Sequence, residues 1–417
     1  MQINKGQFKS IFTVAALYAV IALFFFIFNP QGLNFSDGNS SGKYVDRVDS
    51  YSEYIVRNTI KRNILVQEDK SIFPIVTKGY ADSDYNFYAD GYEKYLSNLS
   101  LQTLPATLIA KLANFNTEKK LDSFFGLLRL ANAFLFALLL SAFLFYFSQV
   151  QQLKHHFLIP FLVGSSTGFV FFSQNLYFAS SLMLIPAVFI AHQLSKHRKF
   201  SKIMVFVFGF IFFLRGYEFA TIFAILTGFS AAFFTMASWK ERLKSFAIAF
   251  CLICAAFVFA VASHIALVSA DNGWTLSASE ATKQAFAKVQ LRTASIKNVP
   301  VPLGPSFVDE MNKRWSSTAF SIDQTGLKIS ELDVLLFIML VFVVRLKSMS
   351  QVEKLIIAYG VFGYLSWYIF AYQHIMWHRM YEWYIFSLTM GLAFSMLMIL
   401  YLNKAAEFIV NRFKQGF

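Results

Sequence analysis

The strongest candidates for a catalytic group are two acidic residues one helical turn apart, Asp46 and Asp49. They lie in a long polar stretch between the first apolar run, 11–28, and the second, 127–148. A carboxylate in such a place can act as a general base on an acceptor hydroxyl, or it can hold a divalent cation. Because outer loops of membrane proteins are rich in solvated Asp, a purely solvated role is the alternative for each of them.

A second candidate is a charged step inside an otherwise apolar stretch. Arg215 and Glu218, in the segment Arg-Gly-Tyr-Glu, interrupt the apolar residues that run from 203 to 236. Charged side chains so close to hydrocarbon cost several kcal/mol unless they are paired or face water. An Arg–Glu pair that stabilises a helical hairpin is one interpretation. The other is that Arg215 binds a phosphate, for which the fork of its guanidinium is well suited.

The third candidate is a dense polar and aromatic cluster toward the C-terminal end. It consists of His374, His378, Arg379, Tyr381 and Glu382. The two histidines are spaced i, i+4 and could bind a metal on a helix, although no Glu stands next to either of them. An aromatic belt with polar anchors at the membrane surface is the alternative. The density of His, Arg and Glu exceeds what a belt requires, which favours a wall of a substrate site.

Two further features each have a functional and a simpler interpretation. Arg292 lies in the basic segment 290–297 of a second long polar stretch, which could meet an anionic lipid headgroup. A solvated run of charges is the alternative there, and it is the interpretation we adopt for Arg314. Cys251 and Cys254 form a CxxC pair inside an apolar run. Since the chain has no second ligand pair, they are predicted to be two small lipid- or helix-facing residues.

The composition assigns the chain to the helical membrane proteins. Of its 417 residues, 56% are hydrophobic and 18% aromatic, and 51 are Phe, more than a water-facing fold can bury. Only 15% are charged, whereas about a quarter is usual for soluble domains. The net charge of +13 does not indicate a nucleic-acid partner, because the basic residues cluster in short loops between apolar runs, as membrane topology requires.

A series of apolar runs are candidates for transmembrane helices. They cover residues 11–28, 127–148, 157–173, 178–194, 203–214, 217–237, 245–268, 333–345, 355–372 and 384–402. The runs 203–214 and 333–345 are shorter than the ~20 residues that a bilayer requires. Basic residues precede the first run and follow every second one, which places both termini in the cytoplasm. The sequence thus predicts an all-α polytopic bundle of about ten transmembrane spans.

This topology divides the chain into five parts. They are the N-terminal tail with the first span (1–28), a long outer loop (29–126), spans two to seven (127–268), a second large outer loop (269–332), and spans eight to ten with a basic cytoplasmic tail (333–417). The first outer loop is predicted to hold two interfacial helices, at 49–63 and 91–104. Aromatic and apolar residues at i, i+3, i+4 and i+7 from Tyr92 make the second a one-sided helix. Helices of this kind lie on the membrane and do not cross it.

This layout resembles the GT-C class of integral-membrane glycosyltransferases. Its members have a cytoplasmic N-terminus, a long first outer loop with two membrane-lying helices and a catalytic acidic residue, several short middle spans, and a later large outer loop. The segment Asp49-Ser-Tyr-Ser-Glu-Tyr54 is similar to the acidic residue and the Tyr-bearing first interfacial helix of the family. The segment Tyr95-Leu-Ser-Asn-Leu-Ser-Leu-Gln102 is similar to the second such helix of some bacterial members. Ser follows Asp49 where several members have a second acidic residue, so the choice between Asp46 and Asp49 stays open.

The resemblance implies a reaction on the outer face of the membrane. A sugar would move from a polyprenyl-phosphate donor to a glycan, lipid or protein acceptor of the cell envelope, with Asp49 as the base. Arg215, and Arg379 with it, would neutralise the departing lipid phosphate. Whether a divalent cation takes part stays open. The partners implied are the lipid-linked sugar, the acceptor and membrane lipids, with no nucleic acid, and the expected location is the bacterial plasma membrane.

Two other functions fit parts of the same layout. A polysaccharide polymerase or ligase also uses glycans linked to a lipid diphosphate and outward-facing Arg and His, but it does not need a carboxylate in the first loop. A transporter or flippase should show paired halves, or Gly/Pro-broken spans at matching depths, which this sequence lacks. We therefore rank the glycosyltransferase first and transport third.

Overall fold

Of the residues that the structure describes, 78% are in helices and 4% in strands, as the sequence predicts for a mainly helical protein. The computed structural model describes residues 5–28, 50–66, 73–77, 92–154, 156–290, 307–322, 325–371 and 381–414. The strands in these residues form two antiparallel two-stranded sheets, β1 with β2 and β3 with β4.

In chain order, the helices are α1 (Lys5–Phe28), α3 (Ser50–Leu65), α4 (Thr103–Leu112), α5 (Glu118–Val150), α6 (Ile159–Gly164), α7 (Thr167–Gln174), α8 (Ser181–Ser195), α9 (Lys202–Arg215), α10 (Ala220–Phe234), α11 (Trp239–Asp271), α12 (Ala278–Gln290), α13 (Phe307–Trp315), α14 (Glu331–Arg345), α15 (Gln351–Phe370), α17 (Tyr381–Phe386), the π-helical turn η2 (Ser387–Gly391) and α18 (Leu392–Lys414). The strands are β1 (Ile75–Thr77), β2 (Tyr92–Lys94), β3 (Thr318–Ile322) and β4 (Leu327–Ser330).

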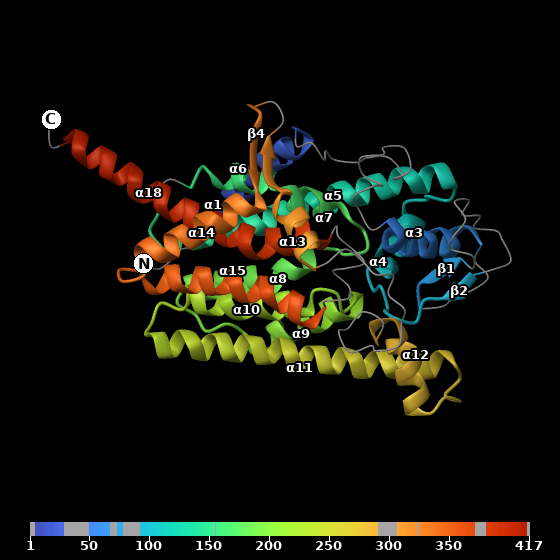
Figure 1. Ribbon diagram of the computed structural model, residues 1–417. Coiled ribbons are helices and arrows are strands. Elements are labelled where there is room, and N and C mark those ends of the chain that lie inside the picture. Colours follow the sequence, from blue (N-terminus) through green and yellow to red (C-terminus); the bar gives the residue numbers. More distant parts are fainter. Residues whose placement is uncertain are drawn as a thin grey trace.

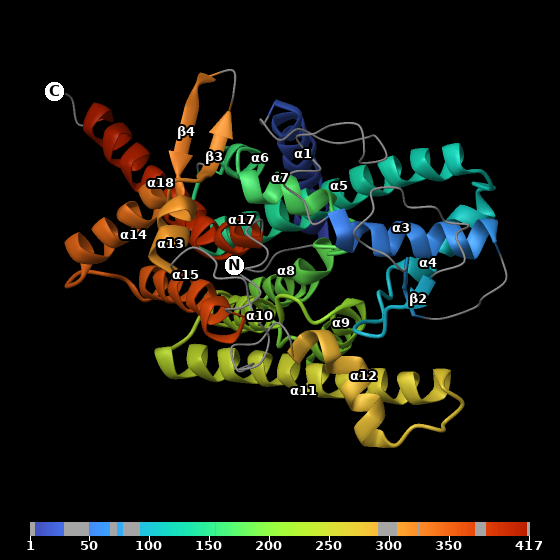
Figure 2. The same ribbon diagram turned by 45° about the vertical axis from the view of Figure 1, so that its right-hand side comes forward.

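The long helices lie side by side in a bundle (Figure 1). α5 packs against α1 and α8, α10 packs against α8, α11 and α15, and α9 packs against α8 and α11. α3, α4, the β1–β2 sheet and α12 gather at one end of this bundle, at the right of Figure 1, and the last part of α18 extends beyond the other end. The view turned by 45° shows the same grouping (Figure 2). We call α3, β1, β2, α4 and the segment 95–102 that joins β2 to α4 the cap, since they cover one end of the bundle.

Several helices have the length or composition of membrane segments. Glu118–Val150, Trp239–Asp271 and Tyr381–Phe413 are long and apolar enough to cross a membrane. Shorter apolar helices cover Ile11–Ile27, Thr103–Leu112, Ser181–Ser195 and Ala220–Phe234. These helices indicate a membrane protein, while the predicted count of about ten spans is not confirmed. Cys251 and Cys254 are free and exposed on α11, which agrees with the prediction for them.

The helix predicted at 49–63 is present as α3, but it is not an exposed amphipathic helix. Arg57 and Lys61, which a membrane-surface helix would keep in water, are buried. Both pair with Asp122 of α5, at 3.5 Å and 3.0 Å. α3 is therefore an internal helix of the cap, packed against α4 and α5.

The second predicted interfacial helix, at 91–104, is wrong. Tyr92–Lys94 form β2, which pairs antiparallel with β1, and α4 begins only at Thr103. The amide of Tyr95 continues this pairing by donating to the carbonyl of Pro74 over 2.7 Å. The spacing of Tyr and Leu indicated a helix, but aromatic residues also fit a half-buried strand, and pairing with β1 favours the strand.

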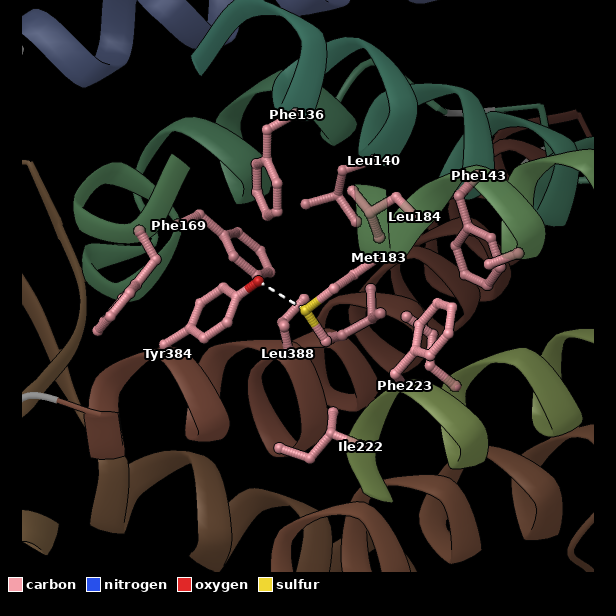
Figure 3. Packing of buried hydrophobic residues seen from close by; sticks show 14 of the residues in the cluster. Phe136, Leu140, Phe143, Phe169, Met183, Leu184, Ile222, Phe223, Tyr384 and Leu388 are labelled. Carbon is pink, nitrogen blue, oxygen red and sulfur yellow. Dashed lines mark hydrogen bonds between the residues drawn. The ribbon is translucent and has the colours of Figure 1, made fainter. Parts of the chain in front are cut away.

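Aromatic and aliphatic side chains of α5, α7, α8, α10 and η2 pack in the middle of the bundle with Tyr384 of α17 (Figure 3). Its hydroxyl donates to the sulfur of Met183 over 2.9 Å. The backbones of α7 and α17 approach so closely that a Cβ at Gly168 would lie 2.1 Å from the carbonyl oxygen of Trp383. This contact holds the beginning of α17, which carries two of the candidate site residues, against the bundle.

A buried carboxylate stabilises the end of the bundle away from the cap. Glu353, which precedes the apolar run 355–372, is 0% exposed. It accepts hydrogen bonds from the amide of Ser350 at 2.7 Å and the hydroxyl of Tyr401 at 2.5 Å, and Lys404 Nζ lies 3.6 Å away. Burial alone would raise the pKa of Glu353, but the hydrogen bonds from Ser350 and Tyr401 and the charge of Lys404 lower it from 4.5 to about 2.

A Glu353→Gln variant is expected to lose up to about 3 kcal/mol of the free energy of unfolding at neutral pH. Because the folded pKa is depressed, this stabilisation is present above the ordinary value of 4.5 and is lost as the pH falls toward about 2. Thermal melting of both proteins in detergent, from neutral pH downward, should give curves that converge at the acid end.

The control is Glu241→Gln, because the Glu241 side chain is 50% exposed and its pair with Lys244 contributes little. Equal melting temperatures of wild type and Glu353→Gln at neutral pH would contradict the prediction.

Candidate functional site

The structure brings polar side chains together in two clusters, and the first is built around the turn between α9 and α10. α9 ends at Arg215 and α10 begins at Ala220. Phe219 adopts left-handed backbone angles, with φ 63°, which are uncommon for a bulky residue. A Cβ on Gly216 would lie 2.4 Å from Glu218 Oε2, so the bare glycine leaves room for the Glu218 carboxylate in this position. The local sequence thus folds Glu218 back against the end of α9.

Arg215 is 1% exposed and is held mainly by carbonyl oxygens. Its guanidinium donates to the carbonyl of Tyr177 at 3.5 Å and to those of Gly216 and Glu218 at 3.4 Å and 3.3 Å. It also lies over the ring of Phe212, 4.7 Å from the centroid. The Glu218 carboxylate is 3.9 Å away, beyond hydrogen-bond distance, and Arg215 Nε has no acceptor among the described residues. These long contacts leave the guanidinium suited to binding a further anion.

Tyr177 connects Glu218 to the cap. Its hydroxyl donates to Glu218 Oε1 at 2.7 Å and accepts from Asn98 Nδ2 at 2.5 Å. Asn98 Oδ1 accepts from the hydroxyl of Ser100 at 2.6 Å, and Gln102 Nε2 donates to the carbonyl of Tyr177 at 2.8 Å. We call Asn98, Gln102, Tyr177, Arg215 and Glu218 the Arg215 site.

A histidine fastens the cap beside the Arg215 site. Nε2 of His264 lies 2.8 Å from the carbonyl oxygen of Leu96, and Nδ1 lies 2.9 Å from the hydroxyl of Tyr217. A carbonyl only accepts, so Nε2 carries the hydrogen and, in the neutral ring, Nδ1 accepts from Tyr217. An ion pair between Lys94 and Asp271, at 2.9 Å, adds a second tie. β2 and the residues after it are thereby held to α11.

The second polar cluster surrounds Glu382 at the start of α17. Its carboxylate accepts hydrogen bonds from the hydroxyls of Tyr364 and Tyr368 and from Arg314 Nη1, the last at 3.1 Å. Arg314 is 4% exposed and Glu382 is 2% exposed, so this ion pair is buried. We call Arg314, Glu331, Tyr364, Tyr368 and Glu382 the Glu382 cluster.

Glu331 differs from Glu382 because no described residue donates to either of its carboxyl oxygens. It is the first residue of α14 and precedes the apolar run 333–345. Burial and the neighbouring Glu382 carboxylate raise the pKa of Glu331 well above its ordinary value, an effect that Arg314 opposes. The cluster therefore contains one carboxylate that is well solvated by donors and one that is not.

An aromatic wall joins the two clusters. Phe219 of the α9–α10 turn stacks on Trp367 with ring centroids 5.0 Å apart, and it meets Tyr381 at 5.6 Å. Phe178 lies 5.3 Å from both Phe219 and Tyr381. Tyr381 is the sequence neighbour of Glu382, so these ring contacts bring the α9–α10 turn close to the start of α17.

Several of the predicted site residues cannot be placed in this arrangement. Asp46, Asp49, Arg292, His374, His378 and Arg379 lie outside the described residues. The other four predicted residues, Arg215, Glu218, Tyr381 and Glu382, are all buried and lie in the two clusters and the wall between them. Their roles in a reaction stay predictions.

The prediction that Arg314 is a solvated charge is wrong, because Arg314 is buried and forms an ion pair with Glu382. Sequence analysis also missed Tyr177 and Glu331. An acidic residue two positions before the start of the short apolar run 333–345 was a signal that could have identified Glu331. Tyr177 gave no such signal, because Tyr is common wherever a helix reaches a membrane surface.

The chemistry that these side chains offer is anion binding beside aromatic faces. Arg215 supplies a positive charge and unused hydrogen-bonding capacity, and the wall supplies apolar rings. In the part of the chain that the structure describes, no group of three or more His, Cys, Asp or Glu side chains could hold a metal ion. No protein-family model, curated protein or solved structure matches this chain, so the geometry of the two clusters and the sequence pattern carry the functional inference.

Proposed function

We propose that this protein is a membrane glycosyltransferase that moves a sugar from a polyprenyl-phosphate donor to a cell-envelope acceptor on the outer face of the membrane. The observation that carries the proposal is the buried guanidinium of Arg215, which long contacts to carbonyl oxygens hold at the end of α9. A departing lipid phosphate gains negative charge in the transition state, and a pre-positioned guanidinium stabilises that charge. We place the protein in the bacterial plasma membrane, with about ten spans and both termini in the cytoplasm.

The reaction needs a base and a group that stabilises the leaving phosphate. Asp49 takes the proton of the acceptor hydroxyl, whose oxygen forms the new bond to C1 of the sugar. The bond between C1 and the phosphate oxygen breaks, and the polyprenyl phosphate leaves with the electron pair while Arg215 balances its charge. Asp46 is the alternative base.

The remaining candidate residues contact the substrates in this proposal. Tyr381 continues the aromatic wall toward Glu382. His374, His378 and Arg379 bind the substrate in this proposal, as the sequence predicts. Arg292 meets the anionic headgroup of the lipid. Glu218 orients Arg215 through the turn and receives the hydroxyl of Tyr177.

The cap supports this assignment of the base. α3 begins at Ser50, directly after Asp49 in the sequence. One helical turn into α3, Glu53 forms a buried ion pair with Arg129 of α5, whose Nε lies 3.0 Å from Glu53 Oε1. A segment anchored in this way is suited to holding a general base in a defined position.

Sugar transfer by the purified protein in lipid tests the proposal. We expect transfer from at least one of a panel of labelled polyprenyl-phosphate sugars, and we expect Asp49→Asn to lower it by about 10²–10⁴-fold or more, because the acceptor loses its base. Asp46→Asn shows which carboxylate acts, because a loss of transfer in that variant alone would identify Asp46, and not Asp49, as the base. The control is Asp333→Asn, which changes an exposed carboxylate at the start of α14.

Two outcomes would contradict the carboxylate mechanism. One is the absence of transfer from every donor in the panel by a folded protein. The other is full activity of both Asp49→Asn and Asp46→Asn. In that second case a polysaccharide polymerase or ligase, which uses Arg and His without a carboxylate in the first loop, becomes the better proposal.

A further inference from the structure

Glu331 is a buried acidic residue that the proposed reaction does not use. It is 0% exposed. Its amide donates to the carbonyl of Ser317 at 2.9 Å, and the amide of Ser317 donates to the carbonyl of Arg314 at 2.7 Å. These two bonds tie the start of α14 to the end of α13. They bring Glu331 within electrostatic range of both Arg314 and Glu382.

The Glu382 cluster holds two carboxyl groups and one cation. Arg314 Nη1 lies 3.1 Å from Glu382 Oε2, so this pair is neutral by itself. Glu382 also accepts from the hydroxyls of Tyr364 and Tyr368, so three donors surround its carboxyl group. The donors of the cluster, Arg314 among them, are therefore directed at Glu382 and not at Glu331.

An ionised Glu331 would add a second negative charge that nothing in the cluster compensates. No described residue donates a hydrogen bond to either of its oxygens. A buried carboxylate without donors or a counter-charge costs several kcal/mol, and a carboxyl group avoids that cost by taking up a proton. A protonated Glu331 leaves one carboxylate facing one guanidinium.

We propose that Glu331 and Glu382 form a proton-binding site that holds one proton at neutral pH, and that Glu331 carries it. The groups that face this site are Arg314 of α13, Tyr364 and Tyr368 of α15, and Glu382 of α17. Asp333, on the same helix as Glu331, is turned to the hydroxyl of Ser330 at 2.7 Å and is exposed. The site does not depend on the proposed sugar transfer.

Infrared difference spectroscopy of the full protein in lipid tests this proposal, because a protonated carboxyl group has a carbonyl stretch that a carboxylate lacks. At neutral pH, wild type minus Glu331→Gln should show the signal of about one carboxylic acid per chain, with a shift in heavy water. The matched control is Asp333→Asn, which removes an exposed carboxylate from the same helix and should leave that signal unchanged.

A Glu382→Gln variant tests the shared charge without changing Glu331. It leaves Arg314 without its carboxylate, so Glu331 should ionise and pair with Arg314, and the carboxylic-acid signal should disappear. The proposal is overturned if wild type shows no such signal at neutral pH, or if either Glu331→Gln or Glu382→Gln retains it. It is also overturned if the signal of wild type appears only after sodium and amines are removed, since a cation would then occupy the place of the proton.

Discussion

A Glu53→Leu variant is expected to lose about 3–5 kcal/mol of the free energy of unfolding. Arg129 is 1% exposed, and its Nε and Nη2 both contact Glu53 Oε1, which is itself buried. Removal of this carboxylate takes a counter-charge away from a guanidinium that is buried from water, and loss of one partner of a buried ion pair is strongly destabilising. Thermal melting of the two proteins in detergent measures the difference.

A double variant separates the loss of charge pairing from the loss of packing. Glu53→Leu combined with Arg129→Met should recover most of the stability, because a buried ion pair can often be replaced by apolar residues of similar volume. Asp122→Asn gives a comparison at the same contact of α3 with α5, since its side chain is 29% exposed and we expect an effect of about 1 kcal/mol or less. An equal loss in the single and the double variant would show that packing, and not charge, is responsible.

Hydropathy predicts the helices of this chain well because it reports a local property. The run 203–214 becomes α9, Lys202–Arg215. Residues 355–370 of the run 355–372 lie in α15, at whose N-terminus the side chain of Ser350 accepts a hydrogen bond from the amide of Glu353. The run 157–173 shows the limit. It is divided between α6 and α7, where the amide of Ser321 in β3 donates to the carbonyl of Ser165 at 2.8 Å. A strand partner so distant in sequence leaves no mark on local hydropathy.

The residues of the two polar clusters also differ in whether the sequence alone reveals them. Arg215 and Glu218 were visible in the sequence because a charge inside an apolar stretch is costly and therefore conspicuous. Arg314 was not, because a charge in a polar stretch looks the same whether it is solvated or buried. Asn98 was hidden for a different reason. Its partner Tyr177 is 79 residues away, and the spacing around Asn98 suggested a helix that the β1–β2 pairing excludes.

Replacement of Arg215 by Lys is expected to reduce the kcat of sugar transfer by about 10²–10³-fold, with a smaller change in KM. Lys keeps the positive charge but loses the planar fork, which can donate two parallel hydrogen bonds to a phosphate. If the guanidinium stabilises charge that grows on the leaving phosphate, its loss acts on the chemical step more than on binding. Initial rates over a range of donor concentrations separate kcat from KM.

Arg242 provides a matched control, because it is another buried arginine that donates to carbonyl oxygens. It is 7% exposed and donates to the carbonyls of Ala232 at 2.9 Å and Phe233 at 3.3 Å, at the C-terminal end of α10. α10 begins beside the Arg215 turn, so its end lies one helix length away from the Arg215 site. Arg242→Lys should therefore lower the melting temperature without the loss of kcat seen in Arg215→Lys. A role at the leaving phosphate requires a loss of kcat that the loss of stability does not explain. If both variants instead lose transfer in proportion to their loss of stability, Arg215 only stabilises the α9–α10 turn.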